Sequence, residues 1–257
     1  MEEKKKIYFA SDAHLGSDLF GDPLEREKKL VRWMDSIKST AKAVYFVGDM
    51  FDYWFEYRDV VPKGYVRFIS KMAEFVDEGI QVYLFVGNHD IWMFDYFQKE
   101  VGAVVIDGVH EVDLYGKKFL ISHGDGLGDP SRAFRLLRAI FRNKICQALY
   151  KSLHPRLTMP FGYAWSRNSR AKKLAKKTEN DGESRYLGED KEHLVIFAKE
   201  YIKTNDVDFF IFGHRHIELN LMITAKSRVV ILGEWLTQFT YGVWDGENFI
   251  LENYTEE

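Results

Sequence analysis

Five apolar runs recur along the chain, and each one ends in polar residues. The runs span residues 7–14, 43–52, 82–90, 118–125 and 208–216 and are rich in Val, Ile, Phe and Tyr. Because their apolar positions are continuous rather than alternating, we expect strands that are covered on both faces. Each apolar stretch stops at Gly, Ser or Asp, and His, Asp or Asn follows. The pattern predicts strands that project polar side chains from their carboxyl ends.

Helical patterns occupy the segments between these runs. Residues 22–38 begin with Asp22, in position to cap a helix, and Pro23 at the first helical position, and apolar residues then recur at helical spacing. Residues 62–78 and 189–203 have the same spacing. Strands that alternate with helices predict an α/β fold built in layers, with ligands bound at the carboxyl ends of the strands.

The composition fits one large domain. A chain of 257 residues suits a single α/β domain or one domain with an insertion, and 46% apolar residues are enough for a large core. The single cysteine, Cys146, excludes an intramolecular disulfide and is compatible with a reducing cytoplasm. The first apolar run is too short for a signal peptide, and no apolar segment approaches the roughly 18 residues of a membrane span. We therefore expect a cytoplasmic protein.

The polar residues at the strand ends are of the kinds that bind metal ions. Carboxylate and imidazole together suit Mn, Fe, Zn or Co better than Ca or Mg. Two such ions about 3.5–4 Å apart can hold a phosphate between them and activate water at neutral pH. The candidate residues are Asp12, His14, Asp49, Asp52, Asn88, His89, Asp90, His123, His214 and His216.

Each of these motifs has a simpler explanation when it is taken alone. Asp12 could cap a turn, and Asn88 tolerates a left-handed turn conformation. The presence of ligand-type residues at five strand ends of one chain favours a metal centre over five unrelated turns. Three further histidines, His110, His154 and His193, lie outside such turns, and we interpret them as surface or packing residues.

The order of the motifs resembles a known superfamily. Along the chain they are D-x-H (12–14), G-D-x-x-D (48–52), G-N-H-D (87–90), H-G-D (123–125) and G-H-x-H (213–216). This ordered set resembles the calcineurin-like metallophosphoesterases. The resemblance implies a single domain over residues 1–257 with a four-layer α/β/β/α sandwich, in which two β-sheets pack between helices. It also implies two divalent metal ions at one edge of the sandwich.

The resemblance implies a role for each candidate residue. Those that would hold one ion are Asp12, His14 and His216. Those that would hold the other are Asn88, His123 and His214, and Asp49 would bridge the two ions. His89 would be the acid that faces the leaving group, and it would contact the substrate together with Asn88. Asp52 and Asp90 would complete the catalytic group by orienting the ligands.

A basic segment interrupts the alternating pattern. Residues 131–178 contain 13 Lys or Arg and no Asp or Glu, whereas the remainder contains 23 basic and 39 acidic residues. Helical spacing places an apolar stripe along the segment, with Arg135, Arg138 and Arg142 on its flank; the stripe residues are Phe134, Leu137, Phe141, Ile145 and Leu149. The stripe could pack on the body, or it could lie in a membrane interface beside anionic lipid. We expect residues 131–188 to form a helical insertion that stands over the site as a lid.

Further segments resemble one branch of the superfamily, the UDP-2,3-diacylglucosamine diphosphatases. These segments are 48–59, 122–128, 212–216 and 232–235, together with the basic insertion itself. The resemblance implies Mn²⁺-dependent cleavage of UDP-2,3-diacylglucosamine to UMP and 2,3-diacylglucosamine 1-phosphate in lipid A assembly, with Fe or Zn as alternative metals. The best-established branch carries Arg where this chain has His89. The region that family members use to hold substrate contains Ser166, Ser169, Arg170 and Lys173.

Three functions follow from these features as expectations. The leading one is a cytoplasmic diphosphatase that acts on a UDP-linked diacylated glucosamine lipid and is peripheral on the inner face of the cytoplasmic membrane, with no protein partner implied. The second is a phosphodiesterase or nuclease whose insertion binds nucleic-acid phosphates. The aliphatic stripe disfavours nucleic acid, because single-strand grooves favour aromatic groups. The third is a scaffold without catalysis, which the complete set of ligand residues disfavours.

Overall fold

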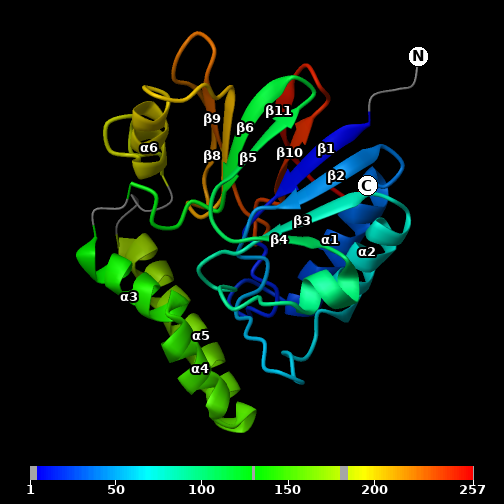
Figure 1. Cartoon of the computed structure of the whole chain (residues 1–257), viewed down its shortest axis with the longest axis vertical. Coiled ribbons are helices and arrows are strands. Elements are labelled where there is room, and N and C mark those ends of the chain that lie inside the picture. The colour runs from blue at the N-terminus through cyan, green and yellow to red at the C-terminus, as the bar shows by residue number, and fades with distance from the viewer. Residues whose placement is uncertain (1–4, 129–130, 180–184, 257) are drawn as a thin grey trace.

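The computed structural model describes residues 5–128, 131–179 and 185–256, with the backbone alone at 132, 134 and 172–179. Two β-sheets form the centre of the molecule (Figure 1). The strands of the first sheet are β1 (Lys6–Ala10), β2 (Ala41–Phe46), β3 (Gln81–Phe85), β4 (Val104–Ile106), β10 (Thr240–Trp244) and β11 (Phe249–Asn253). Those of the second are β5 (His110–Leu114), β6 (Lys117–Ser122), β7 (Phe209–Phe212), β8 (Glu218–Met222) and β9 (Arg228–Leu232).

The strand order brings the predicted motifs to one edge. The first sheet runs β11-β10-β1-β2-β3-β4 and the second runs β5-β6-β7-β9-β8. Strands β1 to β4 pair in parallel, and so do β6, β7 and β9. Parallel neighbours have their carboxyl ends on the same side, so the residues that follow them are brought together.

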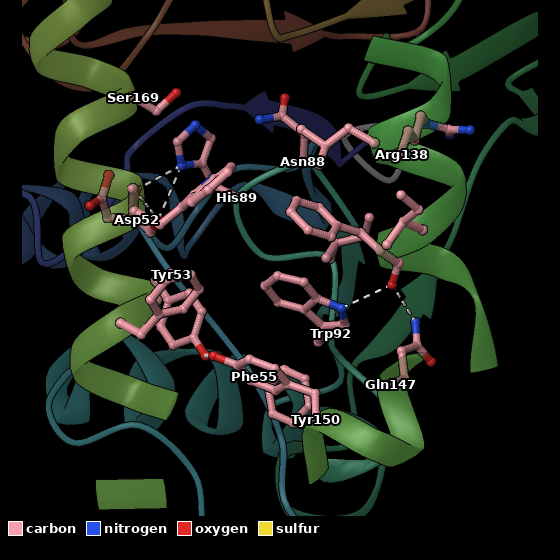
Figure 2. Close-up of a pocket in the computed structure, with 18 of the residues that line it drawn as sticks. Asp52, Tyr53, Phe55, Asn88, His89, Trp92, Arg138, Gln147, Tyr150 and Ser169 are labelled. Carbon is pink, nitrogen blue, oxygen red and sulfur yellow. Dashed lines mark hydrogen bonds between the residues drawn. The ribbon is translucent and has the colours of Figure 1, made fainter. Parts of the chain in front are cut away.

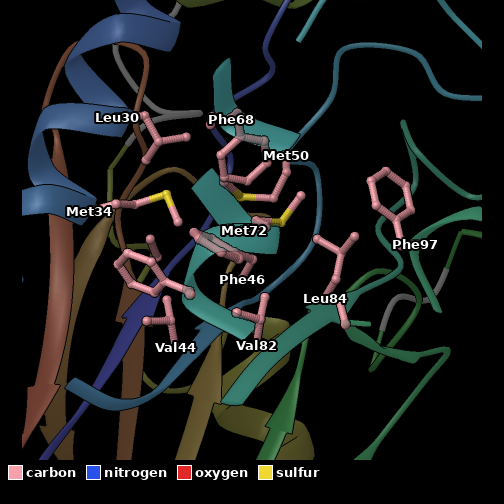
Figure 3. Packing of buried hydrophobic residues seen from close by; sticks show 14 of the residues in the cluster. Leu30, Met34, Val44, Phe46, Met50, Phe68, Met72, Val82, Leu84 and Phe97 are labelled. Carbon is pink, nitrogen blue, oxygen red and sulfur yellow. The ribbon is translucent and has the colours of Figure 1, made fainter. Parts of the chain in front are cut away.

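Helices cover the outer face of each sheet. Helices α1 (Pro23–Ile37) and α2 (Val66–Asp77) pack with the π-helical turn η1 (Phe97–Val101) on the first sheet, as Figure 3 shows for part of this core. Helix α6 (His193–Tyr201) packs on the second sheet. Side chains such as Phe9, Phe119 and Trp244 fill the space between the sheets. The predicted four-layer α/β/β/α sandwich is confirmed.

The continuous apolar runs follow from this layering. In β1, Ile7 and Phe9 point into the core between the sheets, whereas Tyr8 and Ala10 point toward the helices. Successive side chains of a strand point to opposite faces, so a strand with two covered faces needs apolar residues at every position. The side chains of β2 and β3 alternate between the same two cores.

The helix positions are confirmed, but two of the predicted starts are wrong. Helix α1 begins as expected, since the side chain of Asp22 accepts a hydrogen bond from the backbone of Leu24 at 2.8 Å. Helix α2 begins at Val66 rather than near residue 62, because Tyr65 adopts a left-handed conformation (φ 59°). Helix α6 begins at His193 rather than near residue 189, after a turn that ends at Glu192.

The basic segment forms three helices, α3 (Arg132–Arg142), α4 (Lys144–Ser152) and α5 (Pro155–Glu179). They lie together outside the two sheets, at the lower left of Figure 1. Part of the expected insertion, residues 180–184, lies outside the described residues. Within the described ranges, no helix combines the length and apolar character that crossing a membrane requires.

The predicted single apolar stripe is wrong, because the helix breaks at Asn143. The backbone of Asn143 is extended, and its side chain caps α4 by accepting from the backbone N–H groups of Ile145 and Cys146. The break turns the two halves of the stripe in different directions. Phe141 is half-buried, and Phe134 has no described side chain. Ile145 is 71% exposed.

Candidate metal centre

Five loops bring the predicted ligands together at the carboxyl ends of the parallel strands. The loop after β1 carries Asp12 and His14, and the loop after β2 carries Asp49 and Asp52. The loop after β3 carries Asn88, His89 and Asp90; His123 follows β6, and His214 and His216 follow β7. Residues that are more than 200 positions apart in the chain thus share one site.

The backbone around these residues adopts an uncommon conformation. Five of the candidate ligands have positive φ angles: Asp12 (56°), His14 (41°), Asp49 (52°), His214 (68°) and His216 (52°). Non-glycine residues rarely occupy this left-handed region, and such strain of about 1–3 kcal/mol per residue gathers at functional sites. The fold therefore holds these side chains in place at a cost in backbone energy.

Two glycines allow the loops to approach one another. A Cβ atom at Gly87 would overlap the carboxylate and backbone of Asp49, and a Cβ atom at Gly213 would overlap the hydroxyl of Ser11. Only glycine fits at these two positions, which explains why the motifs place glycine beside the ligand residues.

The first group of ligand atoms belongs to Asp12, His14 and His216. The Nε2 atoms of His14 and His216 are 3.3 Å apart. Oδ1 of Asp12 lies 3.2 Å from Nε2 of His216 and 3.6 Å from Nε2 of His14. One ion can be held where these three atoms converge, in agreement with the set that the resemblance implies.

The second group belongs to Asp49, His123 and His214, whose ligand atoms lie within 4.8 Å of one another. Oδ2 of Asp49 is 3.4 Å from Nε2 of His123 and 3.8 Å from Nε2 of His14. This carboxylate therefore lies between the two groups, where one ligand can serve two ions.

The electrostatics and the hydrogen bonding of the site fit cations. Among the described residues, three buried atoms of this site have no hydrogen-bond partner: Oδ1 of Asp12, Oδ1 of Asn88 and Nε2 of His123. An unsatisfied buried polar atom costs about 1–3 kcal/mol, which a bound ion would offset. Burial would lower the pKa of His123, but the carboxylate of Asp49 raises that pKa to about 10. The residues thus fit two divalent metal ions.

Asp90 holds the Asp49 loop from behind. Its Oδ1 accepts hydrogen bonds from the backbone N–H of Gly87 (2.8 Å) and of Asp49 (3.3 Å). Its Oδ2 accepts one from the backbone N–H of Phe51 (3.2 Å). Burial and the neighbouring charge of Asp49 raise the pKa of Asp90 to about 7. Asp90 is therefore in position to orient a ligand, as the resemblance implies.

Asp52 connects the centre to the basic segment. Its carboxylate pairs with Nε of Arg170 in α5, and Nη2 of the same guanidinium contacts Nδ1 of His14. The backbone carbonyl of Asp52 accepts a hydrogen bond from the hydroxyl of Ser166 at 2.7 Å. Arg170, expected to contact substrate, is thus engaged by two residues of the site in this structure.

His89 lies at the junction of both groups. Its Nδ1 is 3.0 Å from the hydroxyl of Ser166 and 3.1 Å from the carbonyl oxygen of Asp52. Its ring meets that of His14 edge-on, with centroids 4.9 Å apart. Ligand atoms of His14, Asp49 and His89 also lie within 4.8 Å of one another. The position of His89 is therefore compatible with two roles, contact with a leaving group or ligation of an ion.

A cavity of about 410 Å³ opens from the centre between the body and the three helices of the basic segment. Figure 2 shows Asn88 and His89 at one end, Phe55 and Tyr150 at the other, and Trp92 between them. The lining is mostly aromatic and aliphatic; it includes Tyr53, Leu137, Ile140, Phe141, Phe161 and Trp165. Long apolar groups fit such a cavity.

The four substrate residues predicted in the basic segment divide into three classes, whereas the other two, Asn88 and His89, both line the cavity. Ser166 and Ser169 line the cavity. Arg170 is buried against Asp52. Lys173 lies in α5, and its side chain lies outside the described part of the chain.

Sequence reasoning missed several residues at this site. The indole of Trp92 lines the cavity and donates to the backbone carbonyl of Phe141 at 3.0 Å. The buried carboxylate of Glu192 accepts from Arg215, between His214 and His216, at 2.8 and 3.2 Å. The aromatic cluster that follows G-N-H-D could have suggested Trp92, whereas no sequence pattern links Glu192 to a residue 23 positions away.

Comparison with known proteins agrees with this geometry. The chain matches the profile of the family described as "Calcineurin-like phosphoesterase" over residues 5–218. It is 43% identical to a UDP-2,3-diacylglucosamine hydrolase of Porphyromonas gingivalis, covering 97% of this chain and 98% of that protein. It is 28% identical to a UDP-2,3-diacylglucosamine hydrolase of Haemophilus influenzae, covering 90% and 91%.

Among solved structures, Yfce, a phosphoesterase from E. coli, is similar to this chain with a TM-score of 0.43 and 15% identity, covering 93% of this chain and 87% of that one. The profile match over most of the chain and the near full-length relative confirm the predicted resemblance. The chain belongs to the calcineurin-like phosphoesterase family, and its activity is that of a metal-dependent phosphoester hydrolase.

Proposed function

We propose that this protein hydrolyses the diphosphate of UDP-2,3-diacylglucosamine, giving UMP and 2,3-diacylglucosamine 1-phosphate for lipid A assembly. The hydrolases named above carry this substrate in their names. The function agrees with the expectation from the sequence. It requires a site for a diphosphate, a site for acyl chains, and a path that joins them.

The cavity is the observation that carries this proposal. It begins at Asn88, His89 and His214 and continues into an aromatic space between the body and the basic segment. A diphosphate held at the centre would place the attached acyl chains in that space. A phosphodiesterase for small polar substrates has no need of an apolar cavity of this size beside its centre.

We assign the side chains of the centre as ligands of two metal ions. Asp12, His14 and His216 would hold one ion, and Asn88, His123 and His214 would hold the other. Asp49 would be a ligand of both. When bound, divalent cations supply polarisation of the phosphoryl oxygens and activation of water. We propose Mn²⁺ as the metal, with Fe or Zn as alternatives, because these metals suit mixed carboxylate and imidazole ligands.

His89 is assigned to the leaving group. Its ring reaches the cavity wall, and its backbone N–H donates to Oδ1 of Asp49 at 2.7 Å, which fixes the loop that carries it. From that position an imidazolium can donate a proton to a leaving oxygen or stabilise its charge. Asp90 and Asp52 are assigned as positioning residues through their contacts with the Asp49 loop and with Arg170.

Residues 131–188 are assigned as a lid of the single domain 1–257. Helices α3, α4 and α5 supply one wall of the cavity, through residues such as Leu137, Phe161 and Ser166. The body supplies the other wall through Tyr53 and Trp92. The cavity exists only while the three helices lie against the body.

The exposed surface of the lid supports a second part of the proposal, that the protein is peripheral on the inner face of the cytoplasmic membrane. Large apolar side chains that do not line the cavity are exposed on all three helices, namely Leu136, Ile145, Leu149 and Leu157. Exposed basic residues, among them Arg135, Lys144 and Arg156, lie on the same helices. Apolar groups beside basic groups suit insertion into an anionic lipid interface, where the substrate lipid is found.

The nuclease alternative is less compatible with this lid. Four of its arginines pair with carboxylates of the body; the pairs are Arg138–Asp125, Arg142–Asp107, Arg167–Asp18 and Arg170–Asp52. Guanidinium groups already neutralised in this way contribute less to phosphate binding. Exposed aliphatic side chains such as Leu136, Ile145 and Leu149 lie on the same helices and offer no surface for base stacking.

One experiment tests the proposal directly. Purified protein, treated with a chelator and then loaded with Mn²⁺, is given UDP-2,3-diacylglucosamine, UDP-N-acetylglucosamine or bis(4-nitrophenyl) phosphate, with product masses as the readout. We expect UMP and diacylglucosamine 1-phosphate from the first substrate, at a far higher kcat/KM than for the other two. Equal kcat/KM values for all three would refute the assigned substrate while leaving the phosphoesterase activity in place.

A further inference from the structure

A buried arginine stands behind the first metal-ligand loop. Arg26 lies in the first turns of α1 and is 4% exposed. Its Nη1 donates to the backbone carbonyls of His14 (3.3 Å) and Ser17 (3.1 Å), and its Nη2 donates to that of Phe20 (2.7 Å). One guanidinium thus gathers three carbonyls of the loop between β1 and α1.

No carboxylate of the described chain lies within ion-pair distance of Arg26, although most other arginines here have such a partner. The Nε atom of Arg26 is buried and has no hydrogen-bond partner among the described residues. The charges of Asp52, Glu234 and Asp22 act on Arg26 only from a longer distance. Burying a cation without a directly paired anion costs free energy, and an apolar side chain of similar size would avoid that cost. The three hydrogen bonds to the loop carbonyls are the interactions that offset this cost.

The loop that Arg26 holds is strained at a metal ligand. His14 has φ 41°, and its carbonyl, besides accepting from Arg26, accepts from the backbone N–H of Ser17 at 3.1 Å. Such a conformation persists only where the surroundings over-determine it. If the carbonyl of His14 were released, the residue could relax toward negative φ. That relaxation would carry the imidazole away from Asp12 and His216.

We propose that Arg26 is a positioning residue that fixes the backbone of His14 and so sets the geometry of the ion site formed by Asp12, His14 and His216. The inference rests on the metal centre proposed above. Arg26 does not line the cavity, so contact with substrate is not its role. It acts through a backbone carbonyl, and for this reason no pattern of ligand-type residues could identify it.

The test uses two variants and a matched control. Arg26→Met keeps a side chain of similar length and removes the hydrogen-bond donors. Arg26→Lys keeps the charge, but its single nitrogen replaces the two nitrogens that donate to three carbonyls in the wild type. Arg32→Met is the control, because Arg32 lies on the same helix, is half exposed and pairs with Glu256. Each protein is stripped of metal and titrated with Mn²⁺, with bound ions counted by elemental analysis and by electron paramagnetic resonance.

We expect one of the two Mn²⁺ sites to weaken by about 10–100-fold in Arg26→Met, as losses of groups that orient ligands usually do. Arg26→Lys should be intermediate, and Arg32→Met should match the wild type. Excess Mn²⁺ should restore much of the kcat of Arg26→Met. A variant that is merely less stable would show a lower Tm with unchanged Mn²⁺ affinity, and that result would overturn the inference.

If Arg26→Met does not fold, Arg26→Lys decides alone, and wild-type affinity at both sites in that variant would overturn the inference. Wild-type protein that binds two ions, with both Arg26 variants binding them equally well, refutes the role of Arg26 only. Wild-type protein that binds no Mn²⁺ refutes the metal centre itself and the inference with it.

Discussion

Asp49 is the residue on which both groups of ligand atoms depend. Its Oδ2 faces His123 and His14, and its Oδ1 accepts from the backbone of His89. We predict that Asp49→Ala binds fewer than two ions per chain and loses activity by a factor of about 100 or more, because the variant lacks both the carboxylate that we assign as the bridging ligand and a loop contact. Elemental analysis of the purified variant measures the ions.

The control for this prediction is Asp59→Ala, since Asp59 is exposed and lies outside the site. That variant should bind metal and turn over substrate as the wild type does. An Asp49→Ala protein that still carries two ions per chain would show that Asp49 does not bridge them.

His89 permits a sharper experiment, because its two possible roles differ in a measurable way. As an acid, His89 matters most when the leaving group is poor, and its loss typically costs about 10²–10⁴-fold. We predict that His89→Ala keeps the wild-type metal content and loses less kcat on a nitrophenyl ester than on an ester with an alkoxide leaving group. His89→Arg should keep activity on the diphosphate, whose leaving group needs no proton.

Two outcomes would contradict this assignment of His89. A loss of bound metal in His89→Ala would make His89 a ligand, as its distance from His14 and Asp49 permits. A loss of the same size for every leaving group would mean that His89 positions the substrate.

The sequence predicts residues that recur as motifs and misses residues that act through the backbone. Asp12, His123 and His214 could be identified because ligand-type side chains follow five strands. Arg26 could not, because its partners are main-chain carbonyls whose positions depend on the folded loop. The left-handed backbone of the ligands is likewise a property of the fold.

At the scale of elements, the strands were predictable and the lid was only partly so. Continuous apolar runs indicate doubly covered strands because every position of such a strand is buried. The sequence correctly predicted that the basic segment is helical. It did not predict that Asn143 ends the first helix and caps the second. A cap inside a helical pattern competes with continuation of the helix, and tertiary contacts decide which prevails.

Gly162 offers a test of how closely α5 must lie against the body. A Cβ atom at Gly162 would overlap the ring of Tyr53. Ala favours helix over Gly by about 1 kcal/mol, so Gly162→Ala should not weaken α5 itself. We predict that Gly162→Ala lowers kcat/KM for the acylated substrate by about tenfold or more, because the displaced helix misplaces the cavity wall.

Two further variants isolate the cause. Asn168→Ala, at an exposed position of the same helix, should behave as the wild type. Tyr53→Ala combined with Gly162→Ala should recover part of the loss, because the smaller side chain leaves room for the new methyl group. No recovery in the double variant, or no loss in Gly162→Ala, would mean that this contact does not set the cavity.

At the scale of the whole molecule, charge is divided between two parts that face each other. The segment 131–178 has 13 basic and no acidic residues, and the remainder has 39 acidic and 23 basic residues. The arginines of the lid meet carboxylates of the body at Asp18, Asp52, Asp107 and Asp125. The charge division therefore draws the lid toward the body, which the sequence alone could not distinguish from attraction to a membrane.

This division changes which residues should contact lipid. The sequence pattern placed Arg135, Arg138 and Arg142 beside the apolar stripe, but Arg138 and Arg142 pair with the body, at Asp125 and Asp107. Exposed apolar residues on α4 are better candidates, with Ile145 at 71% and Leu149 at 64% exposure. They lie on the same helix as the exposed Lys144.

The last prediction separates the two faces of the lid. Replacing Ile145 and Leu149 by Asp should weaken binding to anionic vesicles by about tenfold or more, since a fully inserted side chain of this size contributes about 1.5–3 kcal/mol. The same variant should keep kcat on substrate dispersed in detergent, because neither residue lines the cavity. Replacing Leu137 or Phe141 by Asp should do the reverse, since both line the cavity. Co-sedimentation with vesicles and turnover of the acylated substrate, measured on both variants, give the comparison. Equal effects of the two variants on both measurements would mean that the lid has one apolar surface that serves only its own packing.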